Sequence, residues 1–249
     1  MKFDLLSDLH LERGDVADYK SLLPLNSTHL IVAGDVARST DWDRIVNFFG
    51  VACTNYSTVW YVLGNHEYYN NLYNNTLYYE DKVQKLKDMY KNLIFLNNDF
   101  QYLKHDDLVI YGGVMWSFSP DKKNFPSNLP IFKNNKNITH EHWNDMHQKF
   151  MDGLESAHEY AKSHKCKLMV ISHYSPVVNE SLDSKYHNYN NNFLYCTDLS
   201  KYFSDSVVAW VFGHTGFNCD LNKNGTRVVS NQYRIKSGPK YNKNMYITV

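Results

Sequence analysis

Val59-Trp60-Tyr61-Val62-Leu63-Gly64-Asn65-His66-Glu67 runs from an apolar stretch directly into a turn with polar side chains. A short unbroken run of β-branched and aromatic residues predicts a buried strand over Val59–Leu63. The glycine permits a sharp turn. Asn65 offers a neutral oxygen to a hard cation, and His66 stands beside it as a proton donor. A polar turn that binds nothing would also account for this stretch taken alone.

Four more polar blocks stand at the ends of predicted strands. The blocks are Asp8-Leu9-His10, Gly34-Asp35, Ser172-His173 and Gly213-His214, and the runs before them are Phe3–Leu6, His29–Ala33, Leu168–Ile171 and Val207–Phe212. The ends of parallel strands in α/β sheets open onto the site. We therefore expect six side chains to converge on one pocket: Asp8, His10, Asp35, Asn65, His173 and His214.

Each block alone also has a plainer structural interpretation. Asp35 is well placed as a helix N-cap, and a single histidine is more often a satisfied core residue than a ligand. The five blocks in this order favour metal binding, because carboxylate, imidazole and amide groups together are the ligands that two adjacent divalent ions need.

The rest of the chain predicts alternating strands and helices. Further strands are expected at Leu108–Met115 and Arg227–Val229. Helical spacing places apolar residues on one face in two segments, namely Val83, Leu86 and Tyr90, and Phe150, Leu154, Ala157 and Ala161. Thr139 with His142 is a weak cap near the start of the second helix. This alternation predicts one α/β domain over residues 1–249, with helices outside packed sheets.

Composition limits the possible partners. Lys and Arg together number 26, as do Asp and Glu, so no global field draws the chain to nucleic acid or an anionic membrane, although a local basic patch remains open. The four cysteines lack paired spacing, which favours free thiols in a reducing compartment. An acid at Asp4 and the absence of a long apolar run predict no signal peptide and no membrane span. We expect an intracellular, cytoplasmic protein.

The order and spelling of the five blocks resemble the calcineurin-like metallophosphoesterase superfamily, whose pattern runs D-x-H, G-D, G-N-H-E, H, G-H-x-H. The resemblance extends from Asp8 to about Val229. The segments Met115-Trp116-Ser117 and Gly225–Asn231 are similar to a bacterial branch of uncharacterised members. The resemblance implies a four-layer α/β/β/α sandwich with a dinuclear metal site at the strand ends.

The resemblance also implies a role for each matched residue. Asp8 and His10 would hold the first metal, Asp35 would bridge both, and the second metal would be completed by Asn65, His173 and His214. His66 matches the catalytic histidine, which protonates the leaving oxygen or stabilises charge on the phosphoryl group. A metal-bound hydroxide would attack the phosphorus. Mixed oxygen and nitrogen ligands suit two divalent ions of Mn, Fe, Zn or Co.

The chain departs from the pattern at Gly216, where the family has a histidine that binds the first metal. We expect a weaker first metal site and reduced activity, with outright loss of catalysis as the alternative. Asn218 and Asp220 are candidates for a substitute ligand.

The substrate expected is a small phosphodiester or nucleotide, ahead of a phosphoprotein. Two segments rich in Tyr and Asn, Tyr68–Tyr79 and Tyr186–Tyr195, fall on loops after the motifs. Four tyrosines of these segments are candidates for stacking on a base, namely Tyr68, Tyr69, Tyr73 and Tyr189. The interpretation that we favour is a polar loop that makes no substrate contact. Arg38 would clamp a phosphate or be a solvated arginine. The alternative function is a binding or scaffold protein with a vestigial site, which lacks stoichiometric metal.

Overall fold

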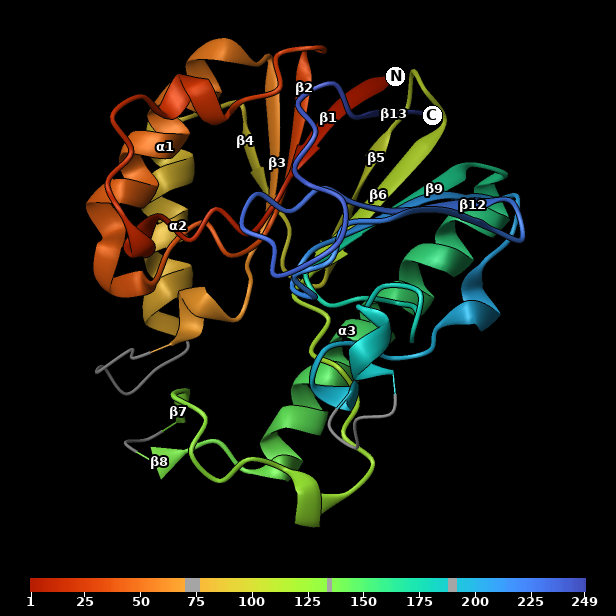
Figure 1. The fold of residues 1–249 in the computed structure, drawn as a ribbon. Helices are drawn as coiled ribbons and strands as arrows, with labels where there is room; N and C mark the ends of the chain where they lie inside the picture. Colours follow the sequence, from red (N-terminus) through yellow and green to blue (C-terminus); the bar gives the residue numbers. More distant parts are fainter. Residues whose placement is uncertain (70–76, 134–135, 188–191) are drawn as a thin grey trace.

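Two β-sheets pack face to face and helices cover their outer faces (Figure 1). The computed structural model describes residues 1–69, 77–133, 136–187 and 192–249. The two sheets and the helices outside them form four layers, so the expected α/β/β/α sandwich is confirmed.

The first sheet has the strand order β13-β1-β2-β3-β4. Its strands are β1 (Lys2–Leu6), β2 (His29–Ala33), β3 (Thr58–Val62), β4 (Leu93–Phe95) and β13 (Tyr246–Thr248). The strands β1 to β4 are parallel, and β13 runs antiparallel to β1 at the edge. The carboxyl ends of β1, β2 and β3 therefore lie at one edge of this sheet.

The second sheet has the order β11-β12-β10-β9-β6-β5. Its strands are β5 (Asp99–Leu103), β6 (Leu108–Gly113), β9 (Lys167–Ser172), β10 (Val207–Phe212), β11 (Asp220–Lys223) and β12 (Thr226–Ser230). The four inner strands are parallel, and β5 and β11 are antiparallel edges. A separate antiparallel pair joins β7 (Phe132–Lys133) to β8 (Lys136–Asn137).

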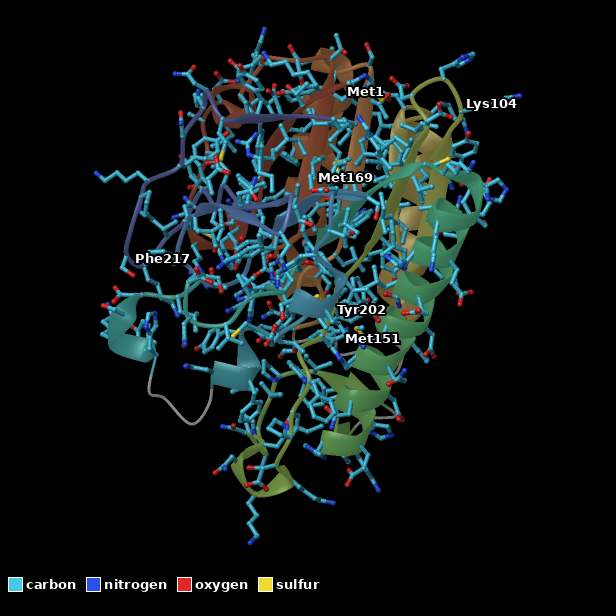
Figure 2. The ribbon with its side chains drawn as sticks, turned by 90° about the vertical axis from the view of Figure 1, so that its right-hand side faces the viewer. Met1, Lys104, Met151, Met169, Tyr202 and Phe217 are labelled. Carbon is cyan, nitrogen blue, oxygen red and sulfur yellow. The ribbon has the colours of Figure 1, made fainter. Side chains whose placement is uncertain are left out.

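Both faces of the inner strands are buried, which explains why they read as unbroken apolar runs. In β2, Ile31 and Ala33 pack with Met169 of β9 in the core between the sheets, and Leu30 points to the helical side. Figure 2 shows Met169 in the interior of the molecule.

Three helices form the outer layers. The helices α1 (Trp42–Asn55) and α2 (Leu77–Met89) lie against the first sheet, and α3 (His140–His164) lies against the second (Figure 1). Short 3-10 helices lie in the loops: η1 (Leu11–Arg13), η2 (Tyr19–Leu22), η3 (Ser39–Asp41), η4 (His66–Tyr68), η5 (Lys122–Asn124), η6 (Ser184–Tyr186), η7 (Asn192–Leu194) and η8 (Ser200–Tyr202).

The predicted strands and helices are present with small shifts at their ends. The run Leu108–Met115 stops as a strand at Gly113. Thr139 caps α3 in a full capping box, because its hydroxyl accepts from the N–H of His142 and its own N–H donates to that side chain. The helix α1 and the short edge strands were not predicted from the sequence. The helix α1 buries Ile45, Phe48, Phe49 and Ala52, a spacing that periodicity would have revealed.

Candidate metal centre

The loops after five strands meet at one end of the two sheets. Asp8 follows β1, Asp35 follows β2 and Asn65 follows β3, all in the first sheet. His173 follows β9 and His214 follows β10 in the second sheet. The structure therefore brings the predicted ligands together from both sheets, because their parallel strands end at the same place.

Among the described residues, three groups of side chains offer ligand atoms within 4.8 Å of one another; one is His10, Glu12 and His66, and the other two share Asp35. Of these two, the first is Asp8, His10 and Asp35, and the second is Asp35, His173 and His214. Metal–ligand distances of about 2.0–2.2 Å put the ligand atoms of one ion at most roughly 4.4 Å apart. The separations of 3.3, 3.7 and 3.9 Å between ligand atoms in these groups lie within that limit.

Asp35 and Asn65 both lie against His173. The Nε2 atom of His173 is 3.3 Å from Oδ1 of Asp35 and 3.0 Å from Oδ1 of Asn65. On the other side of Asp35, Nε2 of His10 lies 3.7 Å from Oδ2, and it lies 3.9 Å from Oδ1 of Asp8. A carboxylate between two imidazoles in this way is well placed to bridge two cations.

Each of these histidines has one ring nitrogen occupied and the other turned to the site. Nδ1 of His173 lies 2.8 Å from the carbonyl oxygen of Ala33, and Nε2 of His214 lies 3.1 Å from that of Leu194. Nδ1 of His10 is 3.2 Å from Oε1 of Glu12. A hydrogen bond of this kind fixes the tautomer and leaves the second nitrogen as a metal ligand. The donor set is thus suited to divalent transition metals.

Four of the candidate residues have left-handed backbones that non-glycine residues rarely adopt. Their φ angles are 54° at Asp8, 45° at His10, 54° at Asp35 and 69° at His214. Each such residue costs on the order of 1–2 kcal/mol, and such strain gathers at functional sites. These strained turns direct the side chains of the four residues into the site, just after each strand ends.

Glu67, the last residue of the Gly64–Glu67 block, joins the loops that carry Asp35 and Asn65. Its buried carboxylate accepts hydrogen bonds from the N–H groups of Asp35, Val36 and Gly64 at 3.1, 2.8 and 2.9 Å. Burial and the nearby negative Asp35 raise the pKa of Glu67 to about 8, while the N–H groups act in the opposite direction.

The glycine of that block is required by close approach, since a Cβ at Gly64 would lie 2.2 Å from Oδ1 of Asp35. Its φ angle is not positive, so the sharp-turn argument is not the reason for glycine here. Close contact with the loop after β2 therefore requires glycine at position 64.

His66 faces the same site from the side. Its N–H donates to Oδ1 of Asp35 at 2.8 Å, and its Nε2 lies 4.0 Å from Oδ2. Its Nδ1 is 3.0 Å from Oε1 of Glu12, the same oxygen that His10 contacts. Glu12 was not predicted from the sequence. The alternation Asp8-x-His10-x-Glu12 was the signal that points to it.

Burial and charge shift the pKa values of the site in opposite directions. Burial opposes a charge on His173, but Asp35 outweighs it and raises the pKa of His173 to about 9. Burial and repulsion from His173 lower the pKa of His214 to about 3. Burial disfavours the charge on Glu12, yet hydrogen bonds from His10 and His66 hold its pKa well below the usual range. The site thus holds imidazoles of very different basicity side by side.

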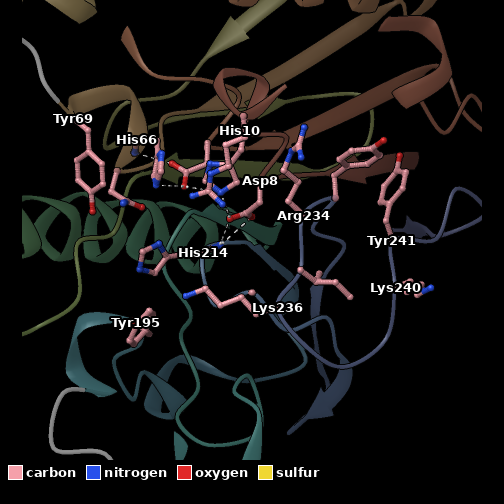
Figure 3. Close-up of a pocket in the computed structure, with 16 residues that line it drawn as sticks. Asp8, His10, His66, Tyr69, Tyr195, His214, Arg234, Lys236, Lys240 and Tyr241 are labelled. Carbon is pink, nitrogen blue, oxygen red and sulfur yellow. Dashed lines mark hydrogen bonds and ion pairs between the residues drawn. The ribbon is translucent and has the colours of Figure 1, made fainter. Parts of the chain in front are cut away.

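A cavity of about 730 Å³ opens over these residues (Figure 3). Its lining includes most of the predicted ligands, His66, two tyrosines of the Tyr/Asn-rich segments and a set of cationic side chains. The residues are Asp8, His10, Arg13, Asp35, Asn65, His66, Tyr69, Tyr195, His214, Gly216, Tyr233, Arg234, Ile235, Lys236, Lys240 and Tyr241. His173 lies beneath this surface and is fully buried. No sequence motif had pointed to the cations after β12.

The residues expected at the substrate lie in different places. Tyr69 lines the cavity, but Tyr68 is buried with its ring 5.2 Å from that of Trp116, away from the cavity. Arg38 is half-buried and does not line the cavity. Tyr73 and Tyr189 lie outside the described residues. The structure therefore gives no support to substrate contacts by Tyr68 or Arg38.

Gly216 has a left-handed φ of 67°, and Lys236 occupies the space beside it. A Cβ at this position would lie 3.2 Å from Cγ of Lys236. Asn218 bonds to the backbone of Gln232, and the carboxylate of Asp220 pairs with Arg227 at 2.8 Å. Neither of these two candidates lines the cavity, so neither replaces the missing histidine in this structure.

The comparisons with known proteins identify a family. The family model described as calcineurin-like phosphoesterase matches residues 1–216. Uncharacterized protein L509 of Acanthamoeba polyphaga mimivirus is 28% identical over 252 residues, which covers 91% of this chain and 89% of that protein.

Two solved structures are similar in fold. Phosphopantetheinyl hydrolase (PptH) from Mycobacterium tuberculosis has a TM-score of 0.67 at 18% identity, covering 94% of this chain and 89% of that one. A dimetal phosphatase from Danio rerio has a TM-score of 0.51 at 14% identity, covering 92% and 86%. At such identities the likeness shows the fold alone.

Among the described residues, no helix is long and apolar enough to cross a membrane. The strand-end site, the four-layer fold and the family match over residues 1–216 lead to one conclusion. The chain belongs to the calcineurin-like phosphoesterase family, whose members are metal-dependent hydrolases of phosphate esters.

Proposed function

We propose that the protein hydrolyses a small phosphate ester, with a phosphodiester or nucleotide favoured, at a centre of two divalent metal ions. The observation that carries this proposal is the pair of ligand groups that share Asp35 and open onto one cavity. A single carboxylate between two imidazole-bearing groups is the arrangement that two adjacent cations require.

We assign Asp8, His10 and Asp35 to the first ion, and Asp35, Asn65, His173 and His214 to the second. The ions, of Mn, Fe, Zn or Co, would supply positive charge to the phosphoryl oxygens and lower the pKa of a nucleophilic water. The second position has four protein ligands and the first has three. Gly216 contributes no side chain to the first, so we propose that the first ion is bound more weakly.

We assign proton transfer to His66. Its Nδ1 lies 3.0 Å from Oε1 of Glu12, so this contact orients the ring of the imidazolium form that transfers the proton. The Nε2–H of that form is then free to donate a proton to the leaving oxygen. Glu12 thus acts on the chemistry through His66, as a positioning residue.

Hydrolysis by the metal-replete protein tests the proposal. The substrate is bis(p-nitrophenyl) phosphate with added Mn²⁺, and metal content is measured on the same sample. His66→Ala should lower kcat by about 10²–10⁴-fold, the range for a positioned acid or base, with metal content retained. The exposed His105 lies away from the cavity, so His105→Ala is the matched control.

A binding or scaffold protein with a vestigial site is the second candidate, favoured by Gly216 and by the lysine beside it. It predicts no stoichiometric metal after metal-replete expression and no hydrolysis.

If His66→Ala instead emptied the metal centre, the role assigned to His66 would be wrong. We also place the protein in the cytoplasm, since all four cysteines are free thiols.

A further inference from the structure

We propose that the substrate carries a second phosphoryl group, which is bound by Arg234, Lys236 and Lys240 in the cavity that the proposed metal ligands also line. This inference rests on the proposed function, because it names a class of substrate for the same cavity. The class is a small molecule with two phosphates, of which one is hydrolysed and the other is held.

The cations come from one segment of the chain, the loop that follows β12. Arg234, Lys236 and Lys240 line the same cavity as Asp8 and His66. In Figure 3, Arg234 lies beside Asp8 and Lys236 lies under His214, while Lys240 is at the far rim. The whole chain has a formal net charge of +0, so this gathering of positive charge is a local property of the cavity.

These cations lack acidic partners. Among the residues that the structure describes, no carboxylate lies within 4.0 Å of the charged nitrogens of Arg234, Lys236 or Lys240. They do not simply neutralise Asp8 or Asp35, because they pair with neither. Unpaired like charges repel one another, and a bound anion would remove that repulsion.

Arg234 is oriented by its own hydrogen bond. Its Nε donates to the carbonyl oxygen of Leu9 at 2.9 Å, and its two terminal nitrogens have no hydrogen-bond partner among the described residues. A guanidinium held at one edge presents its remaining N–H groups in the fixed fork that suits a phosphate.

The backbone fixes this segment against the loops of the metal centre. The N–H of Tyr233 donates to Ser7 at 2.9 Å, that of Arg234 to Asp8 at 3.1 Å, and that of Lys236 to Gly216 at 2.9 Å. The stem of Lys236 lies against Gly216, and its ammonium group is 5.9 Å from the ring centre of Tyr195. The cations are therefore held at set places relative to the metal ligands.

The cavity has room for a ligand larger than a single phosphate. Its volume of about 730 Å³ lies in the range of pockets for small organic ligands, roughly 300–1,000 Å³. Tyr233 and Tyr241 also line it and provide aromatic surface for the organic part between the two phosphates. The formal net charge of +0 gives little support for long nucleic acid as the substrate, so we favour a small molecule.

The test uses two substrates with one scissile bond. They are thymidine 5′-(p-nitrophenyl phosphate) and its 3′-phosphorylated form, compared by kcat/KM in the metal-replete protein. The second phosphate should raise kcat/KM by about tenfold or more, because charge-assisted hydrogen bonds are strong. AMP, ADP and adenosine 3′,5′-bisphosphate, used as competitive inhibitors, test the spacing of the two phosphates.

Charge-removing variants locate the second site. Lys236→Met keeps the stem that packs on Gly216, and together with Arg234→Gln it should abolish most of the preference for the second phosphate. Lys243 is exposed in the same segment but outside the cavity, so Lys243→Met is the matched control and should keep the preference.

Three results have distinct meanings. A wild type that hydrolyses neither substrate contradicts the proposed function itself. Hydrolysis of both at equal kcat/KM, with equal inhibition by all three nucleotides, overturns the second phosphate site alone. A preference that survives Lys236→Met with Arg234→Gln overturns the assignment to these cations.

Discussion

The two proposed metal positions share Asp35 but are built in different ways. The second is enclosed by loops from both sheets, with His173 fully buried beneath it. The first takes Asp8, His10 and Asp35 from one sheet only, and the loop from the facing sheet contributes Gly216. Convergence at strand ends therefore brings the proposed ligands together, and the facing sheet supplies two histidines to the second position and none to the first.

Asp35 is the residue on which both positions depend, so its loss has the largest expected effect. Asp35→Asn keeps the shape of the side chain and removes the charge between the two cations. Activity on bis(p-nitrophenyl) phosphate should fall by roughly 10³-fold or more, since bound metal supplies several kcal/mol of catalysis. Metal content, measured by mass spectrometry, should fall with it. An Asp35→Asn protein that keeps two metals would contradict the claim that both metal positions depend on Asp35.

His173→Ala and His10→Ala separate the two positions. His173→Ala should weaken the tighter site by at least about 100-fold, because even residues that support a metal ligand are worth 10–100-fold. His10→Ala should weaken only the looser one. Calorimetric titration of metal into metal-free protein measures both. The same change in both isotherms would mean that the positions do not differ as described.

Glu12→Gln changes the hydrogen bond between Glu12 and Nδ1 of His66, so it affects proton transfer through His66. The neutral amide replaces the charge-assisted hydrogen bond that orients the ring of His66 with a weaker one, so kcat should fall by about tenfold. KM should change little. Recovery in Glu12→Asp would support positioning by charge. A change in KM alone would exclude it.

The smallest effect is expected at Gly216. Its φ of 67° and the nearby Lys236 mean that Gly216→Ala should destabilise the protein by about 1–2 kcal/mol, measured by thermal unfolding. Gly216→His alone would meet Lys236. In a Lys236→Ala background it should tighten the looser metal site relative to Lys236→Ala alone. No tightening would show that Gly216 does not account for the inequality.

The proposed ligands could be predicted from the sequence because each one lies in the loop that follows a strand. Asp8, Asp35 and His173 needed only the rule that parallel strands end at one edge. Arg234 and Lys236 were out of reach, since their place depends on how the chain returns over the strand ends after β12, and no periodic pattern encodes that path. Tyr68 and Tyr69 illustrate the same limit: two adjacent tyrosines in a 3-10 turn point to the core and to the cavity, and composition cannot distinguish them.

Glu67 has a consequence for the way the protein acquires its ions. Its carboxylate ties the loops of Asp35 and Asn65 together through hydrogen bonds that involve no metal. The conformational entropy of ordering these loops is therefore lost during folding, before any ion arrives. Ion uptake should then release water without a folding step, in contrast to small zinc domains that unfold when stripped. We expect a chelator to abolish the activity of this protein without unfolding it, and added metal to restore that activity.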